Sequence, residues 1–207
     1  MIRNYEKTKS TTAKAYSKIA PNYNSGKKWY EKDGESIDRF LSSLVPNARI
    51  LSIGCGKGEL EGYVASKEYM VTAVDIAPGM IESAKMEFPE VTFQVMDADE
   101  LDFSENSFDA VICRYMSQHV DLDRLLAQIS RVTKSDGKCW LMLHTALDTT
   151  TSLEFGWEEI EEKAIMWLPS SDKARELIQN INMEVTSYKS YPDRSKMMND
   201  ELYVLKV

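Results

Sequence analysis

Residues 50–60 read Ile50-Leu51-Ser52-Ile53-Gly54-Cys55-Gly56-Lys57-Gly58-Glu59-Leu60, an apolar run followed by three glycines at alternate positions and then by a helix-like stretch. The apolar run has the length and composition of a buried β-strand. Glycines after such a strand let the backbone turn tightly and bring its N–H groups close to a ligand, because no Cβ stands in the way. The segment therefore predicts a strand, a ligand-binding loop and a helix, with a tight connection that binds nothing as the alternative.

Strand-like and helix-like segments alternate along the rest of the chain. Apolar residues at i, i+3, i+4 and i+7 predict amphipathic helices at Ile37–Leu44 and Leu122–Ile129, and a later helix at Ala174–Ile181. Such alternation is typical of βαβ units, in which helices cover both faces of a mostly parallel sheet, so an α/β fold is expected. The predicted strands are Arg49–Ile53, Tyr69–Val74, Val91–Met96, Phe108–Cys113, Lys138–Leu143, Met183–Tyr191 and Glu201–Val207.

Length and composition predict one cytoplasmic domain without a membrane span. A chain of 207 residues, 43% of them hydrophobic, can bury a core without disulfides or a structural metal. Its net charge of −8 disfavours a nucleic-acid partner. Cys55, Cys113 and Cys139 are odd in number and lack CxxC spacing, which indicates a reducing compartment. Neither a signal peptide nor a long apolar segment is visible.

Two acidic residues follow the next two predicted strands. Asp75 ends the second strand and Asp97 follows the third, so both carboxylates are expected at the edge of the sheet that carries the glycine loop. There Asp75 could accept hydrogen bonds from both hydroxyls of a ribose, and Asp97 could accept one from the amino group of adenine. Each acid alone is more often a solvated residue or a helix cap. A nicotinamide cofactor is disfavoured, because Glu59 stands where a dinucleotide-binding loop has its third glycine.

Five motifs occur in order: Gly54-Cys55-Gly56-Lys57-Gly58, Val74-Asp75-Ile76, Asp97-Ala98, Ser107-Phe108-Asp109-Ala110-Val111 and Arg131-Val132-Thr133-Lys134-Ser135-Asp136-Gly137. Over about residues 13–143 the chain resembles the class I S-adenosylmethionine-dependent methyltransferases, in particular the ubiquinone/menaquinone branch. The resemblance implies a Rossmann-like three-layer sandwich whose seven-stranded sheet is mostly parallel with an antiparallel last strand. It also implies S-adenosylmethionine as the cofactor and a small molecule as the methyl acceptor.

The resemblance also suggests how one domain over residues 1–207 is divided. The helices of an N-terminal arm or lid would precede the cofactor-binding core, and a later insertion would lie at the substrate side. The expected parts are 1–45 for the arm, 46–144 for the core, 145–170 for the insertion and 171–207 for a C-terminal helix and strands.

Carried over by position, the resemblance implies a set of cofactor contacts. The glycine loop would line the methionine part, Asp75 would bind the ribose, and residues after the second and third strands would surround the adenine. Ser52 stands where the family usually has Asp or Glu to help hold the cofactor's amino group, so that contact is expected to be weaker or taken over elsewhere. The expected cofactor-binding residues are Tyr16, Tyr23, Gly54, Cys55, Gly56, Asp75, Ile76, Met80, Asp97, Ala98 and Arg114.

A general base is needed only when the acceptor must lose a proton, and three residues are candidates. Tyr115 and His119 follow the fourth predicted strand, and His144 follows the fifth. Ordinary packing or hydrogen bonding is the alternative for each histidine. Arg114 could hold an anionic substrate or pair with a nearby acid.

Further expectations concern the aromatic residues, metals and the alternatives to catalysis. Aromatic side chains could shield the sulfonium or stack on a flat substrate, with packing as the alternative. No metal site is expected, because the fourth and fifth strand ends lack clustered acids. The chain could be a monomer or a homodimer, and a non-catalytic protein that binds S-adenosylmethionine or S-adenosylhomocysteine is the alternative function. The aromatic residues are Trp29, Tyr30, Phe155, Trp157 and Trp167.

Overall fold

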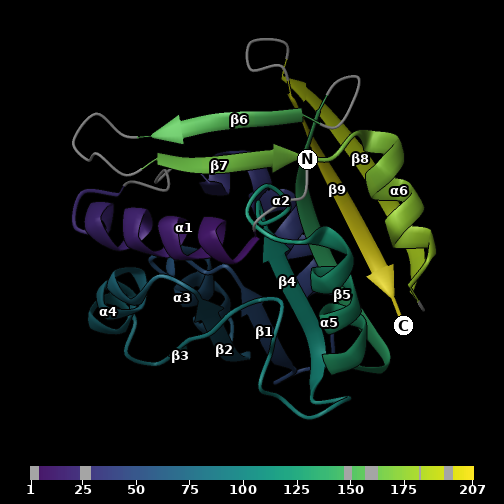
Figure 1. The fold of residues 1–207 in the computed structure, drawn as a ribbon. Coiled ribbons are helices and arrows are strands. Elements are labelled where there is room, and N and C mark those ends of the chain that lie inside the picture. The colour runs from purple at the N-terminus through teal and green to yellow at the C-terminus, as the bar shows by residue number, and fades with distance from the viewer. Residues whose placement is uncertain (1–4, 24–28, 147–150, 157–162, 182, 194–197) are drawn as a thin grey trace.

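A central β-sheet organises the structure (Figure 1). The computed structural model describes residues 5–23, 29–146, 151–156, 163–181, 183–193 and 198–207. Within these residues seven strands form the sheet, in the order β3-β2-β1-β4-β5-β9-β8. Their bounds are β1 Arg49–Ile53, β2 Met70–Asp75, β3 Thr92–Val95, β4 Phe108–Arg114, β5 Thr133–Ala146, β8 Glu184–Asp193 and β9 Met198–Lys206.

The strand directions confirm the predicted topology. β1 is parallel to β2 and β4, β2 is parallel to β3, and β4 is parallel to β5. β9 is antiparallel to both of its neighbours, β5 and β8. The last strand of the chain is therefore the antiparallel one in an otherwise parallel sheet, and the α/β, Rossmann-like class is confirmed.

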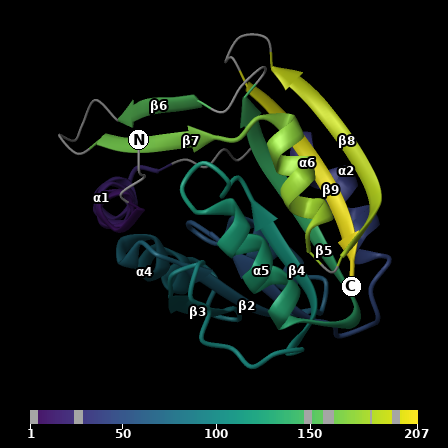
Figure 2. The ribbon, with the colours of Figure 1, turned by 45° about the vertical axis from the view of Figure 1, so that its right-hand side comes forward.

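Helices cover both faces of the sheet and give three layers (Figure 2). One apolar cluster joins the sheet to α2, α3 and α4, and a second joins its other face to α5 and α6. Among the described residues, no helix combines the length and the apolar composition needed to cross a bilayer. The bounds are α2 Trp29–Leu41, α3 Glu59–Ala65, α4 Pro78–Glu87, α5 Leu122–Val132 and α6 Ser171–Gln179.

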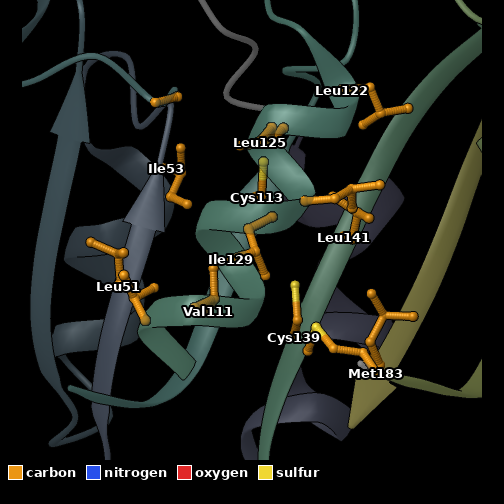
Figure 3. Packing of buried hydrophobic residues seen from close by; sticks show 14 of the residues in the cluster. Leu51, Ile53, Val111, Cys113, Leu122, Leu125, Ile129, Cys139, Leu141 and Met183 are labelled. Carbon is orange, nitrogen blue, oxygen red and sulfur yellow. The ribbon is translucent and has the colours of Figure 1, made fainter. Parts of the chain in front are cut away.

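The apolar composition of strand β1 follows from its position in the middle of the sheet, with side chains buried on both faces. Side chains alternate between the faces of a strand, so Leu51 and Ile53 pack toward α5 while Ile50 packs in the cluster of the opposite face. Figure 3 shows Leu51 and Ile53 on the same side as Leu125 and Ile129 of α5. Because both faces of the strand are buried, it has no polar alternation, which is why the sequence reads as a continuous apolar run.

The N-terminal segment contains more helix than the hydrophobic pattern predicts. A helix was predicted from Ile37, but α2 already begins at Trp29, and another helix, α1, spans Tyr5–Ile19. Figure 1 shows α1 lying across the carboxyl ends of the central strands, where it contacts α4 and β7. The sequence of α1 is mostly polar, because only a narrow stripe that includes Ala15 and Ile19 is buried.

Part of the predicted insertion forms a separate antiparallel pair, β6 (Thr151–Gly156) with β7 (Lys163–Leu168). β7 lies beside α1 in both ribbon views (Figures 1 and 2). The division of the chain into arm, core, insertion and C-terminal part stays a prediction. Four of the five aromatic side chains considered above lie outside what the structure describes, namely those of Trp29, Phe155, Trp157 and Trp167.

Candidate functional site

A cavity of about 670 Å³ opens at the carboxyl ends of the parallel strands, between the sheet and α1. Its volume lies within the range of roughly 300–1,000 Å³ that is usual for small-molecule and cofactor sites. Every residue predicted to bind the cofactor or to act in catalysis contributes to its wall. These residues are Tyr16, Tyr23, Gly54, Cys55, Gly56, Asp75, Ile76, Met80, Asp97, Ala98, Arg114, Tyr115, His119 and His144.

The glycine loop forms one wall with backbone that other residues rarely adopt. Gly54, Gly56 and Gly58 have φ angles of 75°, 54° and 80°, which lie in the left-handed region. The Gly54 and Cys55 N–H groups both donate to the Val74 carbonyl, at 2.8 and 3.1 Å, and this ties the loop to β2. A Cβ at Gly56 would meet no atom within 4 Å, so the backbone there faces open space inside the site.

Asp75 holds two neighbouring loops with its carboxylate. Its Oδ2 accepts a hydrogen bond from the Gly56 N–H, and its Oδ1 accepts one from the Ala77 N–H, both at 2.9 Å. Burial raises the pKa of Asp75, although these N–H groups favour the ionised form. Each carboxylate oxygen has a second lone pair, so the side chain can still accept hydrogen bonds from a ligand.

Asp97 pairs with a residue that the sequence analysis missed, Lys9 of α1. The Lys9 Nζ lies 2.8 Å from Asp97 Oδ2 and 2.8 Å from Asp99 Oδ2. Burial alone would lower the pKa of Lys9, but the two carboxylates raise it above its usual value. Lys9 lies in a polar helix far along the chain from Asp97 and Asp99, so nothing in the local sequence pattern indicates the pairing.

His119 is held by the N-terminal helix. The Tyr16 hydroxyl and His119 Nε2 are 3.1 Å apart, and the two rings meet edge to face at 5.4 Å between centroids. Burial lowers the pKa of His119 to about 4, so the ring is neutral near pH 7. Burial also raises the pKa of Tyr16, so the hydroxyl keeps its proton. Tyr16 and His119 therefore share one hydrogen bond within the cavity wall.

His144 is oriented by a carboxylate that the sequence analysis also missed. Its Nδ1 lies 2.6 Å from Oδ1 of Asp200, which comes from the neighbouring strand β9, and Lys32 pairs with the other oxygen of Asp200. Burial would raise the pKa of Asp200, but the contacts with His144 and Lys32 hold it below the usual value. The Tyr115 ring stacks on the His144 ring, with 4.2 Å between the centroids. The backbone of Tyr115 has a φ of 56°, which lies in the left-handed region. Such strained backbone is often found at functional sites.

Arg114 contacts an acid of α2 at the cavity wall. Its Nε lies 3.2 Å from Oδ2 of Asp33, a residue of α2 that is almost fully buried. Burial raises the pKa of Asp33, and Arg114 and Lys32 oppose that rise. Arg114 therefore pairs with a nearby acid while it also lines the cavity.

Ser52 makes a short contact with another acid in the cavity wall. Its hydroxyl donates to Glu61 Oε1 at 2.5 Å, and both residues line the cavity. Glu61 belongs to α3 and is 3% exposed. Burial raises the pKa of Glu61 to about 7. The local sequence does not single out Glu61, because an acid in the first turns of a helix is ordinarily a solvated residue.

The described side chains contain no cluster of three or more His, Cys, Asp or Glu residues placed to hold a metal ion. The acids of the cavity instead pair with cations, hydroxyls and backbone N–H groups, as with Lys9, Ser52 and Gly56. The site can therefore offer a ligand carboxylate oxygens, open backbone and a carboxylate-oriented imidazole.

Part of the chain matches a described protein family and two curated relatives. Residues 51–141 match the family described as Methyltransferase domain. The chain is 36% identical over 95 residues to the demethylmenaquinone methyltransferase of Renibacterium salmoninarum. This match covers 45% of this chain and 40% of that protein. It is 30% identical over 131 residues to a ubiquinone biosynthesis O-methyltransferase of Xanthomonas oryzae pv. oryzae, with 55% of each chain covered. The chain thus spans about half the length of the curated relatives it matches.

A solved structure shares the fold over the whole chain. The 1,6-didemethyltoxoflavin-N1-methyltransferase of Burkholderia thailandensis, solved with 1,6-didemethyltoxoflavin and S-adenosylhomocysteine bound, matches with a TM-score of 0.76. The match covers 100% of this chain and 91% of the other at 14% sequence identity. At that identity the likeness shows the fold.

Proposed function

We propose that this chain, which has the fold of class I methyltransferases and matches the Methyltransferase domain family over residues 51–141, transfers a methyl group from S-adenosylmethionine to a small organic molecule. One observation carries the proposal: a single cavity joins an open glycine loop to a histidine oriented by a carboxylate. The relatives named as quinone-pathway and toxoflavin methyltransferases support an acceptor of small-molecule size.

The residues at the strand ends fit the cofactor. The open space at Gly56 lets a ligand lie against the backbone, and Asp75 has lone pairs left for the ribose hydroxyls. Ile76, Met80 and Ala98 offer apolar surface for the adenine, with Asp97 at its edge. Glu61 has a buried carboxylate oxygen, Oε2, without a hydrogen-bond partner in the described structure, and a cationic ligand group would satisfy it.

When bound, S-adenosylmethionine supplies a methyl group on a positively charged sulfur, and the sulfur keeps the electron pair of the broken C–S bond. The acceptor would supply the oxygen, nitrogen, carbon or sulfur atom that takes this methyl group. Aligning these atoms away from water provides most of the acceleration. The cavity in which these atoms would be aligned lies between α1 and the strand ends.

His144 is proposed as the general base. Asp200 holds Nδ1, which leaves Nε2 to receive the proton of an acceptor hydroxyl or amine. Tyr115 stacks on the ring and helps fix its orientation. We assign His119 a positioning role, because its Nε2 is engaged with the Tyr16 hydroxyl and its lowered pKa makes the buried ring a weak base.

Binding and turnover test the proposal separately. We expect S-adenosylhomocysteine to bind in calorimetry, and Asp75→Ala to weaken that binding. Labelled S-adenosylmethionine should methylate at least one member of a panel of hydroxylated and amine-bearing metabolites. The His144→Asn variant should then lose most of the transfer, by about 100-fold or more, while it still binds S-adenosylhomocysteine.

Two other outcomes would change the assignment. Absence of S-adenosylhomocysteine binding at millimolar concentration would refute the proposal. Binding without transfer to any metabolite of a broad panel would favour the non-catalytic binding protein. Unchanged turnover in His144→Asn would remove only its role as a base.

The cellular setting is part of the same proposal. Free cysteines at positions 55, 113 and 139 support a reducing, cytoplasmic location. The net charge of −8 supports a reaction without nucleic acid. We propose a monomer or a homodimer, which sedimentation would distinguish.

A further inference from the structure

We infer that Glu61 and Ser52 together form the subsite for the ammonium group of the cofactor's amino acid part, an inference that rests on the proposed function. In this arrangement the carboxylate comes from helix α3, and strand β1 contributes a hydroxyl. Ser52 thus stands where the resemblance leads one to expect an acid.

The geometry assigns the two oxygens of Glu61 different tasks. The Ser52 hydroxyl donates to Oε1 at 2.5 Å and fixes the direction of the carboxylate. Oε2 is buried and has no hydrogen-bond partner among the described residues, although Glu61 lines the cavity. A buried carboxylate oxygen without a donor is costly, so a ligand that brings a donor to it gains binding energy.

The surroundings favour a cationic donor. Glu61 follows the glycine loop in sequence and lines the same cavity as Gly54 and Gly56, next to which the methionine part of the cofactor is proposed to lie. Burial raises the pKa of Glu61 to about 7, and an ammonium beside it would favour the ionised form. Ammonium to carboxylate is a charge-assisted hydrogen bond, which is about twice as strong as a neutral one.

Arg114 and Asp75 are the charged neighbours of this subsite. Arg114 lowers the pKa of Glu61 and Asp75 raises it, so the two act in opposite directions. Arg114 is paired with Asp33, and Asp75 is held by backbone N–H groups. The Oε2 atom of Glu61 is therefore left to the ligand.

Two ligands that differ at the proposed contact provide the test. S-adenosylhomocysteine carries the ammonium, whereas 5′-methylthioadenosine has the same adenosine and a thioether but no amino acid part. Calorimetry of both ligands is compared between the full-length chain and its Glu61→Gln variant, which keeps the side-chain size and removes the charge. We expect the variant to bind S-adenosylhomocysteine about 10- to 100-fold more weakly. Its affinity for 5′-methylthioadenosine should stay within about twofold, because this ligand lacks the ammonium and has no contact with Glu61 to lose.

A matched variant controls for net charge. Glu82→Gln removes one negative charge from an exposed position of α4 and should change neither affinity. Equal weakening of both ligands in Glu61→Gln, or unchanged binding of S-adenosylhomocysteine, would overturn the inference and leave the proposed function standing. If the unaltered chain binds neither ligand, the proposed function fails and the subsite fails with it.

Discussion

Gly54 and Gly56 share a left-handed backbone but differ in what a side chain would meet. A Cβ at Gly54 would lie 2.1 Å from Sδ of Met116, whereas one at Gly56 would meet nothing within 4 Å. Left-handed backbone costs a non-glycine residue roughly 1–2 kcal/mol. Gly54→Ala must also displace Met116, so its cost to stability is larger.

We therefore expect Gly56→Ala to lower the free energy of unfolding by only about 1–2 kcal/mol while it abolishes S-adenosylhomocysteine binding, because its methyl group enters the ligand's space. Urea unfolding and calorimetry on the same preparations measure both effects. Gly54→Ala serves as the comparison and should be the less stable variant. A Gly56→Ala protein that binds as tightly as the unaltered chain would show that the ligand does not approach this loop.

Glu61 makes stability depend on pH. Its pKa rises from 4.5 to about 7 on folding, because burial opposes ionisation, and Arg114 and the Ser52 hydroxyl offset part of the rise. The folded state therefore binds the proton more tightly, and its stability falls as the pH increases between these two values. Glu61→Gln should reduce this fall by at most about 3 kcal/mol. Urea unfolding of both proteins between about pH 5 and pH 8 measures the difference, and parallel pH profiles would contradict it.

For single residues, the sequence could predict those that belong to local motifs. It could not predict which distant residues form hydrogen bonds or ion pairs with them. The glycine loop and Asp75 lie next to predicted strands, which places them at one edge of the sheet. Asp200 and Lys9 act on His144 and Asp97, which lie far from them in sequence. Only the folded arrangement of β9 beside β5, and of α1 over the sheet, brings these pairs together.

Among the elements, buried strands were predictable because their composition is set by burial on both faces. Strand β5 shows the limit: it was predicted as Lys138–Leu143 and spans Thr133–Ala146. Its first residues are polar and join the sheet through the pairing of Thr133 with Phe108, which no hydrophobic pattern signals. The hydrophobic pattern did not indicate helix α1 for a similar reason, since a buried lysine forms part of its contact with the core, and only the resemblance led us to expect helix in this segment.

The attachment of α1 rests partly on that lysine. Lys9→Met would leave Asp97 and Asp99 without their cation, and breaking a buried pair in this way usually costs about 3–5 kcal/mol. We expect α1 to separate from the core more often, so limited proteolysis should cleave within α1 at least about tenfold faster. Lys14→Met changes an exposed lysine of the same helix and should leave the cleavage rate unchanged. Equal rates in both variants would show that the ion pairs do not anchor the helix.

In the whole molecule, the cavity is completed by two parts of the chain that lie far apart in sequence. The strand ends supply the glycine loop and the acids, and α1 supplies Lys9 and Tyr16. Figure 1 shows why this is possible, because α1 crosses the edge of the sheet at which the parallel strands end. If a ligand contacts both α1 and the strand ends, α1 must move away before the ligand can leave.

This linkage predicts ligand-dependent protection of α1 from hydrogen exchange. At about 100 times its Kd, S-adenosylhomocysteine would stabilise the closed state by about 2.7 kcal/mol, so exchange that requires α1 to open should slow about 100-fold. Helix α6 packs against α5 and β5, contributes no residue to the cavity wall, and provides the internal control. Mass spectrometry of peptides from both helices measures the two rates. Protection confined to the strand ends, with α1 exchanging as fast as before, would mean that the ligand enters and leaves while α1 moves independently. Protection of α1 without protection of α6 would show that α1 closes over the bound ligand.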